Sequence, residues 1–150
     1  MLVYWINRSY NARLGGVNRL DIADVGFLIG TNLAGIVCLE KEASSQELAQ
    51  ILGVSWLHIP MVAGNPPSDA ELKQIVDFVH DCEKNGTNRP ILFHSESDCS
   101  GTILAALLII LDGLPPDLAI TRIRAVNPFA LNNQADYNFV NTMKPGFLNR

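Results

Sequence analysis

Apolar residues along the chain fall into short runs that are separated by polar or helix-breaking positions. Four of these runs are rich in β-branched or aromatic residues and are bounded by Gly, Pro, Asn or polar stretches, a pattern typical of strands. They cover residues 2–6, 35–39, 56–61 and 91–94. We therefore predict a short strand at each of these four places.

Helical spacing of apolar positions is found between and after these runs. At Ser44 and Ser68 a serine is followed three residues later by Glu47 or Glu71, the spacing of a capping box that satisfies exposed helix amides. Asn127-Pro128 breaks the helical pattern before the last segment. The predicted helices cover residues 45–52, 69–84, 102–111, 116–126 and 132–141.

The third predicted helix is apolar on nearly every side, as expected of a helix buried in the middle of a domain. Strands that alternate with helices and then give way to a helical final third predict an α/β (α+β) fold. We expect a single central sheet of about four to five mostly parallel strands, flanked by about five to six helices. At 150 residues, with 48% hydrophobic and 17% charged residues, the chain suits one globular domain over residues 1–150.

Charge and cysteine content narrow the possible partners. The net charge of −4 and the lack of a basic cluster argue against nucleic acid or an anionic membrane as a partner. The longest apolar run, residues 103–111, is far shorter than the ~20 residues that a membrane-spanning helix needs. Cys38, Cys82 and Cys99 are odd in number and form no CxxC pair, so neither a disulfide framework nor a structural zinc site is indicated. We predict a cytoplasmic protein.

The strand at residues 91–94 runs through a polar loop directly into the apolar helix. Such a junction can direct several backbone amides at one point, and the positive end of the helix adds to their field, so phosphate commonly binds there. We take this loop as the candidate anion-binding or partner-binding site. Its residues are His94, Ser95, Glu96, Ser97, Asp98, Cys99, Ser100, Gly101 and Thr102.

This junction resembles the signature region of the cysteine-dependent protein tyrosine and dual-specificity phosphatases, whose pattern is H-C-x5-R-[ST]. The stretch from Trp56 to Ser68, which reads WLHIPMVAGNPPS, resembles the general-acid loop of that family. Tyr4-Trp5-Ile6 and Leu14-Gly15-Gly16 resemble its N-terminal strand pair. The resemblance spans nearly the whole chain and is closest to the small dual-specificity type, which implies that fold.

The resemblance also shows which chemical groups are missing. It puts the nucleophile position at Ser95, the phosphate-binding arginine at Gly101 and the general acid at Ala63. Serine lacks the thiolate of the family, glycine cannot grip phosphate oxygens, and alanine cannot protonate a leaving group. Ser95 and Ala63 also match substitutions made deliberately to trap substrates, whereas Gly101 and the acidic loop do not. The resemblance therefore implies a pseudophosphatase without an intact catalytic residue.

Two acidic side chains in the loop also argue against phosphatase activity. Glu96 and Asp98 beside a helix start are each attracted to it by about 0.3–1 kcal/mol and repel a phosphate. We expect Asp98, or a hydroxyl of Ser97 or Ser100, to cap the amides that a phosphate would otherwise occupy. His94, Glu96, Asp98 and Cys99 can also be read as metal ligands, but a solvated acidic loop beside a buried structural histidine needs no ion. We predict neither a metal nor a cofactor.

These observations favour a catalytically inactive phosphatase-like domain that acts as a binding or regulatory module in signalling. Its expected partner is a protein, with a phosphoprotein among the candidates. One alternative is an enzyme of altered chemistry, either a residual phosphatase or a metal-, Ser- or Cys-dependent hydrolase using the same loop. The other is a structural subunit of a homo-oligomer.

Overall fold

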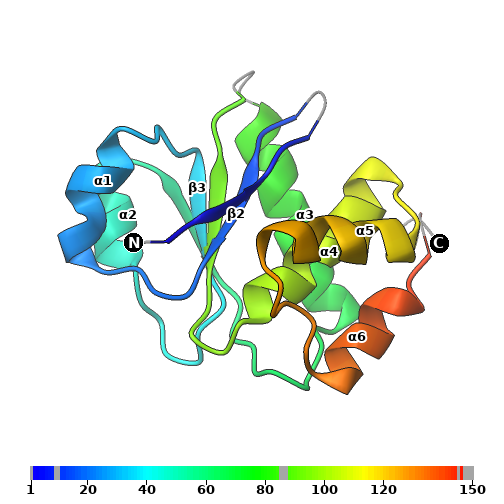
Figure 1. Cartoon of the computed structure of the whole chain (residues 1–150). Helices are drawn as coiled ribbons and strands as arrows, with labels where there is room; N and C mark the ends of the chain where they lie inside the picture. Colours follow the sequence, from blue (N-terminus) through cyan, green and yellow to red (C-terminus); the bar gives the residue numbers. More distant parts are fainter. Residues whose placement is uncertain (1, 9–10, 85–87, 145, 147–150) are drawn as a thin grey trace.

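The computed structural model describes residues 2–8, 11–84, 88–144 and 146, and is built on one five-stranded sheet (Figure 1). The strand order is β1-β2-β5-β3-β4; β1 runs antiparallel to β2 and every other neighbouring pair is parallel. The prediction of a mostly parallel sheet of four to five strands is confirmed. The strands are β1 (Tyr4–Ile6), β2 (Leu14–Val17), β3 (Gly35–Cys38), β4 (Ser55–His58) and β5 (Ile91–His94).

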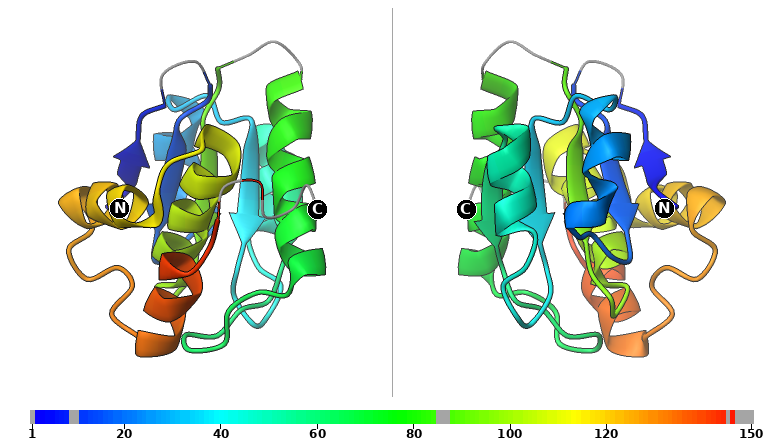
Figure 2. Two further views of the ribbon diagram at one scale, coloured as in Figure 1. Left: turned by 90° about the vertical axis from the view of Figure 1, so that its right-hand side faces the viewer. Right: turned by 90° about the vertical axis from the view of Figure 1, so that its left-hand side faces the viewer.

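Six α-helices and one 3-10 helix cover the sheet, with α1 and α2 on one face and α3 to α6 on the other (Figures 1 and 2). Each face has its own hydrophobic core, because side chains of a strand point alternately to opposite sides. The helices are η1 (Ile22–Asp24), α1 (Val25–Ile29), α2 (Gln46–Leu52), α3 (Asp69–Lys84), α4 (Cys99–Asp112), α5 (Pro116–Val126) and α6 (Gln134–Asn141).

The alternation of strand β5 determines which face receives each candidate residue. Phe93 packs in the core beneath α3 and α4, whereas Leu92 packs in the core beneath α1 and α2. By the same alternation His94 faces α2, and the next side chain faces α4. Cys38 is the register partner of His94 on the neighbouring strand β3, so the two side chains share the α2 face.

The two predicted capping boxes have different outcomes. The box at Ser68 and Glu71 is confirmed, because the Glu71 amide donates to Ser68 Oγ at 3.1 Å and the Ser68 amide donates to Glu71 Oε1 at 2.9 Å. The predicted capping box at Ser44 and Glu47 is not formed, so this prediction is wrong. Helix α2 begins at Gln46 after Ser45, which has φ 64° and caps no amide, while the Ser44 hydroxyl bonds to Glu40 instead.

Two other boundaries differ from the prediction. Helix α4 begins at Cys99, three residues before the predicted start at Thr102. Helices η1 and α1 were not predicted, although Asp21 and Asp24 form a reciprocal capping box at their start. Their short length and exposed apolar residues give little helical periodicity. Within the described residues, none of the helices has the length and apolar character that crossing a membrane requires.

Candidate functional site

The loop between β5 and α4 is tighter than the sequence indicates. Strand β5 ends at His94 and helix α4 begins at Cys99, which leaves residues 95–98 for the turn. The turn closes through Asp98, whose φ of 60° and ψ of 29° are left-handed. Aspartate tolerates this conformation better than most residues. Residues 99–101 of the expected loop therefore already lie in the first turn of the helix.

The hydroxyl of Ser95 occupies the start of this helix. Ser95 is fully buried, and its Oγ accepts a hydrogen bond of 3.2 Å from the backbone amide of Cys99. The same oxygen lies 3.2 Å from Ser97 Oγ, which in turn lies 3.2 Å from Cys99 Sγ. The hydroxyl of Ser95, which the resemblance puts at the nucleophile position, thus bonds an amide at the start of α4, where amides commonly bind anions.

The expected capping residues have other partners. Asp98 makes no capping bond, and its carboxylate accepts a hydrogen bond of 3.2 Å from the side-chain amide of Asn127. Ser100 lies 2.7 Å from the hydroxyl of Tyr4 on strand β1. The expectation that Asp98, Ser97 or Ser100 would cap the amides is therefore wrong at Cys99, where Ser95 is the acceptor.

Burial changes the acidity of two groups beside the loop. It raises the pKa of Asp98, and the hydrogen bond from Asn127 opposes this effect only in part. Burial also raises the pKa of Tyr4 to about 12, against the opposing hydrogen bonds of Ser100 and Asn127. Tyr4 is therefore a neutral phenol near neutral pH and supplies no charge at this site.

A cleft of about 380 Å³ opens beside the loop and brings several predicted residues together. Ala63 lies there with part of the loop, whereas Ser95 and Gly101 are buried behind it and Glu96 is exposed outside it. Among the described lining residues, two are carboxylates and none is Lys, Arg or His. The lining residues are Ala63, Ser97, Asp98, Thr102, Phe129, Leu131, Asn132, Asn133 and Asp136.

Asp136 on α6 is a further feature of this cleft. It is only 5% exposed, and its carboxylate accepts a hydrogen bond of 3.0 Å from the amide of Gly64. It thereby ties helix α6 to the segment that carries Ala63, which the resemblance puts at the general-acid position. An aspartate in the first turn of a helix normally indicates only a favourable dipole interaction, so no local pattern predicts its contact with Gly64.

Gly101, which the resemblance puts at the arginine position, packs against the segment that connects α5 and α6. A Cβ atom added at Gly101 would lie 2.7 Å from Cβ of Ala130 and 3.6 Å from Cγ2 of Ile123. Carbon atoms in favourable contact are about 3.5–4.0 Å apart. The direction in which a side chain would leave position 101 is therefore already filled.

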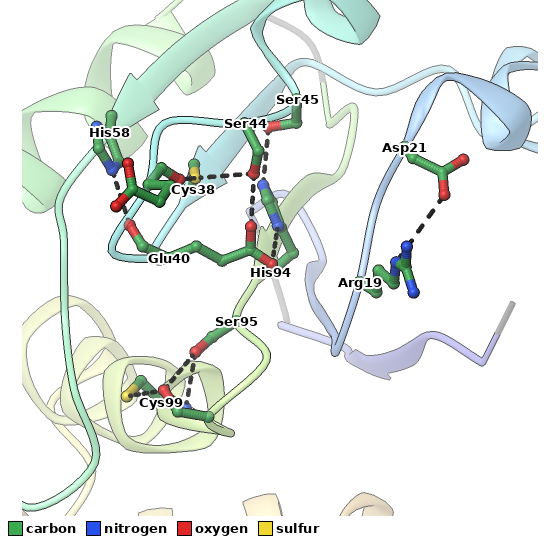
Figure 3. Close-up of polar contacts among 12 residues, drawn as sticks. Arg19, Asp21, Cys38, Glu40, Ser44, Ser45, His58, His94, Ser95 and Cys99 are labelled. Carbon is green, nitrogen blue, oxygen red and sulfur yellow. Dashed lines mark hydrogen bonds and ion pairs between the residues drawn. The ribbon is translucent and has the colours of Figure 1, made fainter.

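On the opposite face of the sheet, His94 joins a second polar cluster (Figure 3). Its Nε2 lies 2.7 Å from Ser45 Oγ, and its Nδ1 lies 3.5 Å from Oε1 of Glu40. The ligand atoms of Cys38, Glu40 and His94 all lie within 4.8 Å of one another. The metal reading that grouped His94 with Glu96, Asp98 and Cys99 does not match this arrangement, because His94 points away from helix α4 (Figure 3).

The thiol of Cys38 is unusually acidic in this cluster. Burial raises its pKa, but polar contacts of the sulfur, first with His94 and then with Ser44, outweigh that effect and lower the pKa to about 7. Ser44 Oγ lies 3.5 Å from the sulfur and donates to Glu40 Oε2 at 2.5 Å. Sequence reasoning missed Cys38 and Glu40 because the register of β3 against β5, which brings them to His94, is a contact between distant segments.

Comparison with known proteins identifies the class to which this fold and loop belong. A family model described as a polymorphic toxin system DSP-PTPase phosphatase matches residues 19–113, more than half of the chain. The chain belongs to this family of phosphatase-like domains. A sequence search of curated proteins finds no match.

Solved structures show the same fold at low sequence identity. A protein tyrosine phosphatase from Leishmania major superposes with a TM-score of 0.77 at 13% identity, covering 96% of this chain and 99% of the other. Tk-PTP in its active form gives a TM-score of 0.74 at 19% identity, with 93% and 94% covered. Kinase-associated phosphatase, with its catalytic cysteine replaced by serine, gives 0.72 at 23% identity, with 93% and 91% covered. The fold is that of protein tyrosine and dual-specificity phosphatases.

Proposed function

We propose that this chain is a catalytically inactive phosphatase-like domain that acts by binding a protein partner through the cleft beside α4. The observation that carries the proposal is the chemistry of that cleft, which has two carboxylates and no cation among its described lining residues. A phosphatase site needs positive charge and free amides for the transferring phosphoryl group. This cleft supplies the opposite charge.

The nucleophile position supports the same proposal. Ser95 is fully buried and its hydroxyl is engaged with the Cys99 amide and Ser97. A serine nucleophile needs an adjacent base. The neighbouring imidazole, His94, bonds to Ser45 on the other face of the sheet, so it is not placed to take a proton from Ser95. An enzyme of altered chemistry based on Ser95 therefore has less support than a binding module.

The cleft favours a partner segment that is neutral or basic. Asp98 and Asp136 provide acceptors, and Asn132 and Asn133 provide polar groups that suit an amide or a lysine or arginine side chain. Phe129 at the cleft is 77% exposed, as expected of an aromatic side chain available to a partner. A phosphoprotein is disfavoured by the same charges. Within a polymorphic toxin system, such a domain would serve recognition instead of hydrolysis.

Hydrolysis of a small aryl phosphate tests the inactive part of the proposal. We expect the wild-type protein and Ser95→Ala to give the same rate, equal to that of buffer. The matched comparison is between variants purified in the same way, because a trace phosphatase would contribute equally to both. Turnover by the wild type that is abolished in Ser95→Ala would show a catalytic serine and refute the proposal.

Peptide binding tests the cleft. Two peptides of the same sequence, one with lysine and one with phosphotyrosine at the central position, are titrated while the amide NMR signals of residues 97–102 and 132–136 are followed. We expect the lysine peptide to bind more tightly, and Phe129→Ala and Asp136→Asn to weaken it. Ile51→Ala, on the exposed surface of α2, is the control that leaves binding unchanged. Tighter binding of the phosphotyrosine peptide would contradict the charge argument.

A further inference from the structure

The cluster on the α2 face of the sheet contains a buried ring nitrogen without a hydrogen-bond partner. His94 is fully buried, and among the described residues its Nδ1 makes no hydrogen bond. Buried polar atoms are nearly always paired, so an unpaired one indicates either a missing ligand or stored strain. The nitrogen points toward the sulfur of Cys38 and the carboxylate of Glu40.

We propose that Cys38, Glu40 and His94 bind a divalent transition-metal ion, with zinc the preferred ion. A thiolate, an imidazole and a carboxylate are the three donor types that zinc accepts, and three protein ligands leave a fourth position for water or a further group. Magnesium and calcium prefer sites made of oxygen atoms, so they fit poorly here. This site is separate from the cleft, and the proposed function does not depend on it.

The distances suit a site that closes slightly around the ion. The three ligand atoms lie within 4.8 Å of one another. Zinc bonds of about 2.0 Å to nitrogen or oxygen and about 2.3 Å to sulfur place tetrahedral ligands about 3.3–3.8 Å apart. The adjustment falls on Glu40, whose side chain is 16% exposed, because Cys38 and His94 are fully buried on paired strands. The exposed edge of Glu40 also gives the ion a route from solvent.

The surrounding contacts orient the ligands as in known metal sites, where a ligating histidine donates its other ring N–H to the protein. Ser45 Oγ lies 2.7 Å from His94 Nε2 and also accepts a hydrogen bond of 3.0 Å from Trp56 Nε1. When Nε2 donates to Ser45, the lone pair of Nδ1 is free for a metal. The Ser44 hydroxyl holds the second carboxylate oxygen of Glu40.

The charge of the assembled site also favours a divalent cation. A thiolate ligand and a carboxylate ligand together carry two negative charges, which a divalent ion neutralises. Burying a balanced set of charges that are bonded to one another costs far less than burying an isolated charge.

Zinc titration of the metal-stripped full chain tests the proposal. We expect one zinc per chain in competition with a chromophoric chelator, and cobalt substitution that gives a thiolate-to-cobalt absorption band. Cys38→Ser and Glu40→Gln should each weaken zinc binding by at least about 10–100-fold. Cys82→Ser and Glu42→Gln are the matched controls and should bind zinc like the wild type, because neither side chain belongs to the cluster.

If Cys38→Ser does not fold, Glu40→Gln still tests the proposal. Glu40 is partly exposed, and glutamine has nearly the same shape as glutamate, so this variant should fold. Circular dichroism establishes that each variant is folded before titration. No zinc binding by the wild type would overturn the proposal, and so would zinc binding that Glu40→Gln leaves unchanged. Loss of the cobalt band in Cys38→Ser but not in Cys82→Ser would support it.

Discussion

His94 and Ser95 are adjacent in the sequence, yet they belong to opposite faces of the sheet and to sites of opposite character. Ser95 lies on the α4 face, where its hydroxyl and the Cys99 amide satisfy one another. His94 lies on the α2 face, where its Nδ1 has no hydrogen-bond partner among the described residues. The face that resembles a phosphatase site is thus closed on itself, whereas the face behind it has an unpaired ring nitrogen.

This contrast teaches that two neighbours in a motif need not share one site. In the sequence, both residues belong to one polar loop. In the structure, the end of strand β5 separates them, and each interacts with helices from a different part of the chain. The following substitutions test how different and how independent the two faces are.

The largest effect is expected at Gly101, on the α4 face of the sheet. Gly101→Arg should lower the free energy of unfolding by about 4 kcal/mol or more, because it overpacks the contact with Ala130 and buries a charge. Gly101→Ala should cost about 1–2 kcal/mol by the contact alone. Urea unfolding measures both values. Adding Ala130→Gly to Gly101→Ala should recover at least about 0.5 kcal/mol of the free energy of unfolding. If the effects of the two substitutions simply add, the contact between these residues is not the cause of the loss.

Ser45, which contacts His94 on the α2 face of the sheet, should give the next largest effect. Ser45→Ala should lower the free energy of unfolding by about 2–3 kcal/mol, because His94 Nε2 and Trp56 Nε1 both lose their partner. Ser45→Gly should cost about 1 kcal/mol less, since glycine adopts the φ of 64° at this position without strain. Urea unfolding of both variants separates the two contributions. Equal losses would mean that the left-handed backbone stores no strain.

Ser95 tests whether the two faces are independent. Ser95→Ala should cost about 1 kcal/mol, because the Cys99 amide loses its acceptor at the start of α4. Combined with Ser45→Ala, the two losses should add within about 0.5 kcal/mol, as expected of sites that share no partner. A larger coupling in the unfolding measurements would show that the end of β5 links the faces.

Asp98 should give the smallest effect, and one that depends on pH. The pKa of Asp98 is raised in the folded protein, so folding is opposed above that pKa, where the carboxylate is charged, and is favoured as pH falls through it. Asp98→Asn removes this cost and fits the left-handed backbone. Its melting temperature should exceed that of the wild type at pH 7, and the difference should shrink toward pH 3. A difference that grows on acidification would contradict this sign.

Local patterns in the sequence predicted much of the fold, and contacts between distant segments account for most of what they missed. The strand at 91–94 and the capping box at Ser68 depend on neighbours in the chain, and both are confirmed. Ser44 has the same spacing to Glu47, but its hydroxyl bonds to Glu40 and lies near Cys38, which are local competitors on the other side of it in the chain. The spacing of a capping box does not show which neighbour such a hydroxyl will bond to.

The candidate site divides in the same way. Ala63 and part of the loop, which the resemblance singled out from separate parts of the chain, line the same cleft. The contacts of Asp136 with Gly64 and of Ala130 with Gly101 were not predicted, because both residues reach the site from the last third of the chain. Position-specific packing of this kind has no periodicity that a sequence can display.

The contact between Gly101 and Ala130 also constrains how this protein can evolve. Ala130 lies beyond residue 113, outside the segment that matches the family model. An arginine at position 101 would arise in a background where a distant alanine already fills the space its side chain needs. Relieving that overlap requires a second change, at Ala130. For a lineage that accumulates one substitution at a time, an arginine at position 101 is therefore hard to gain.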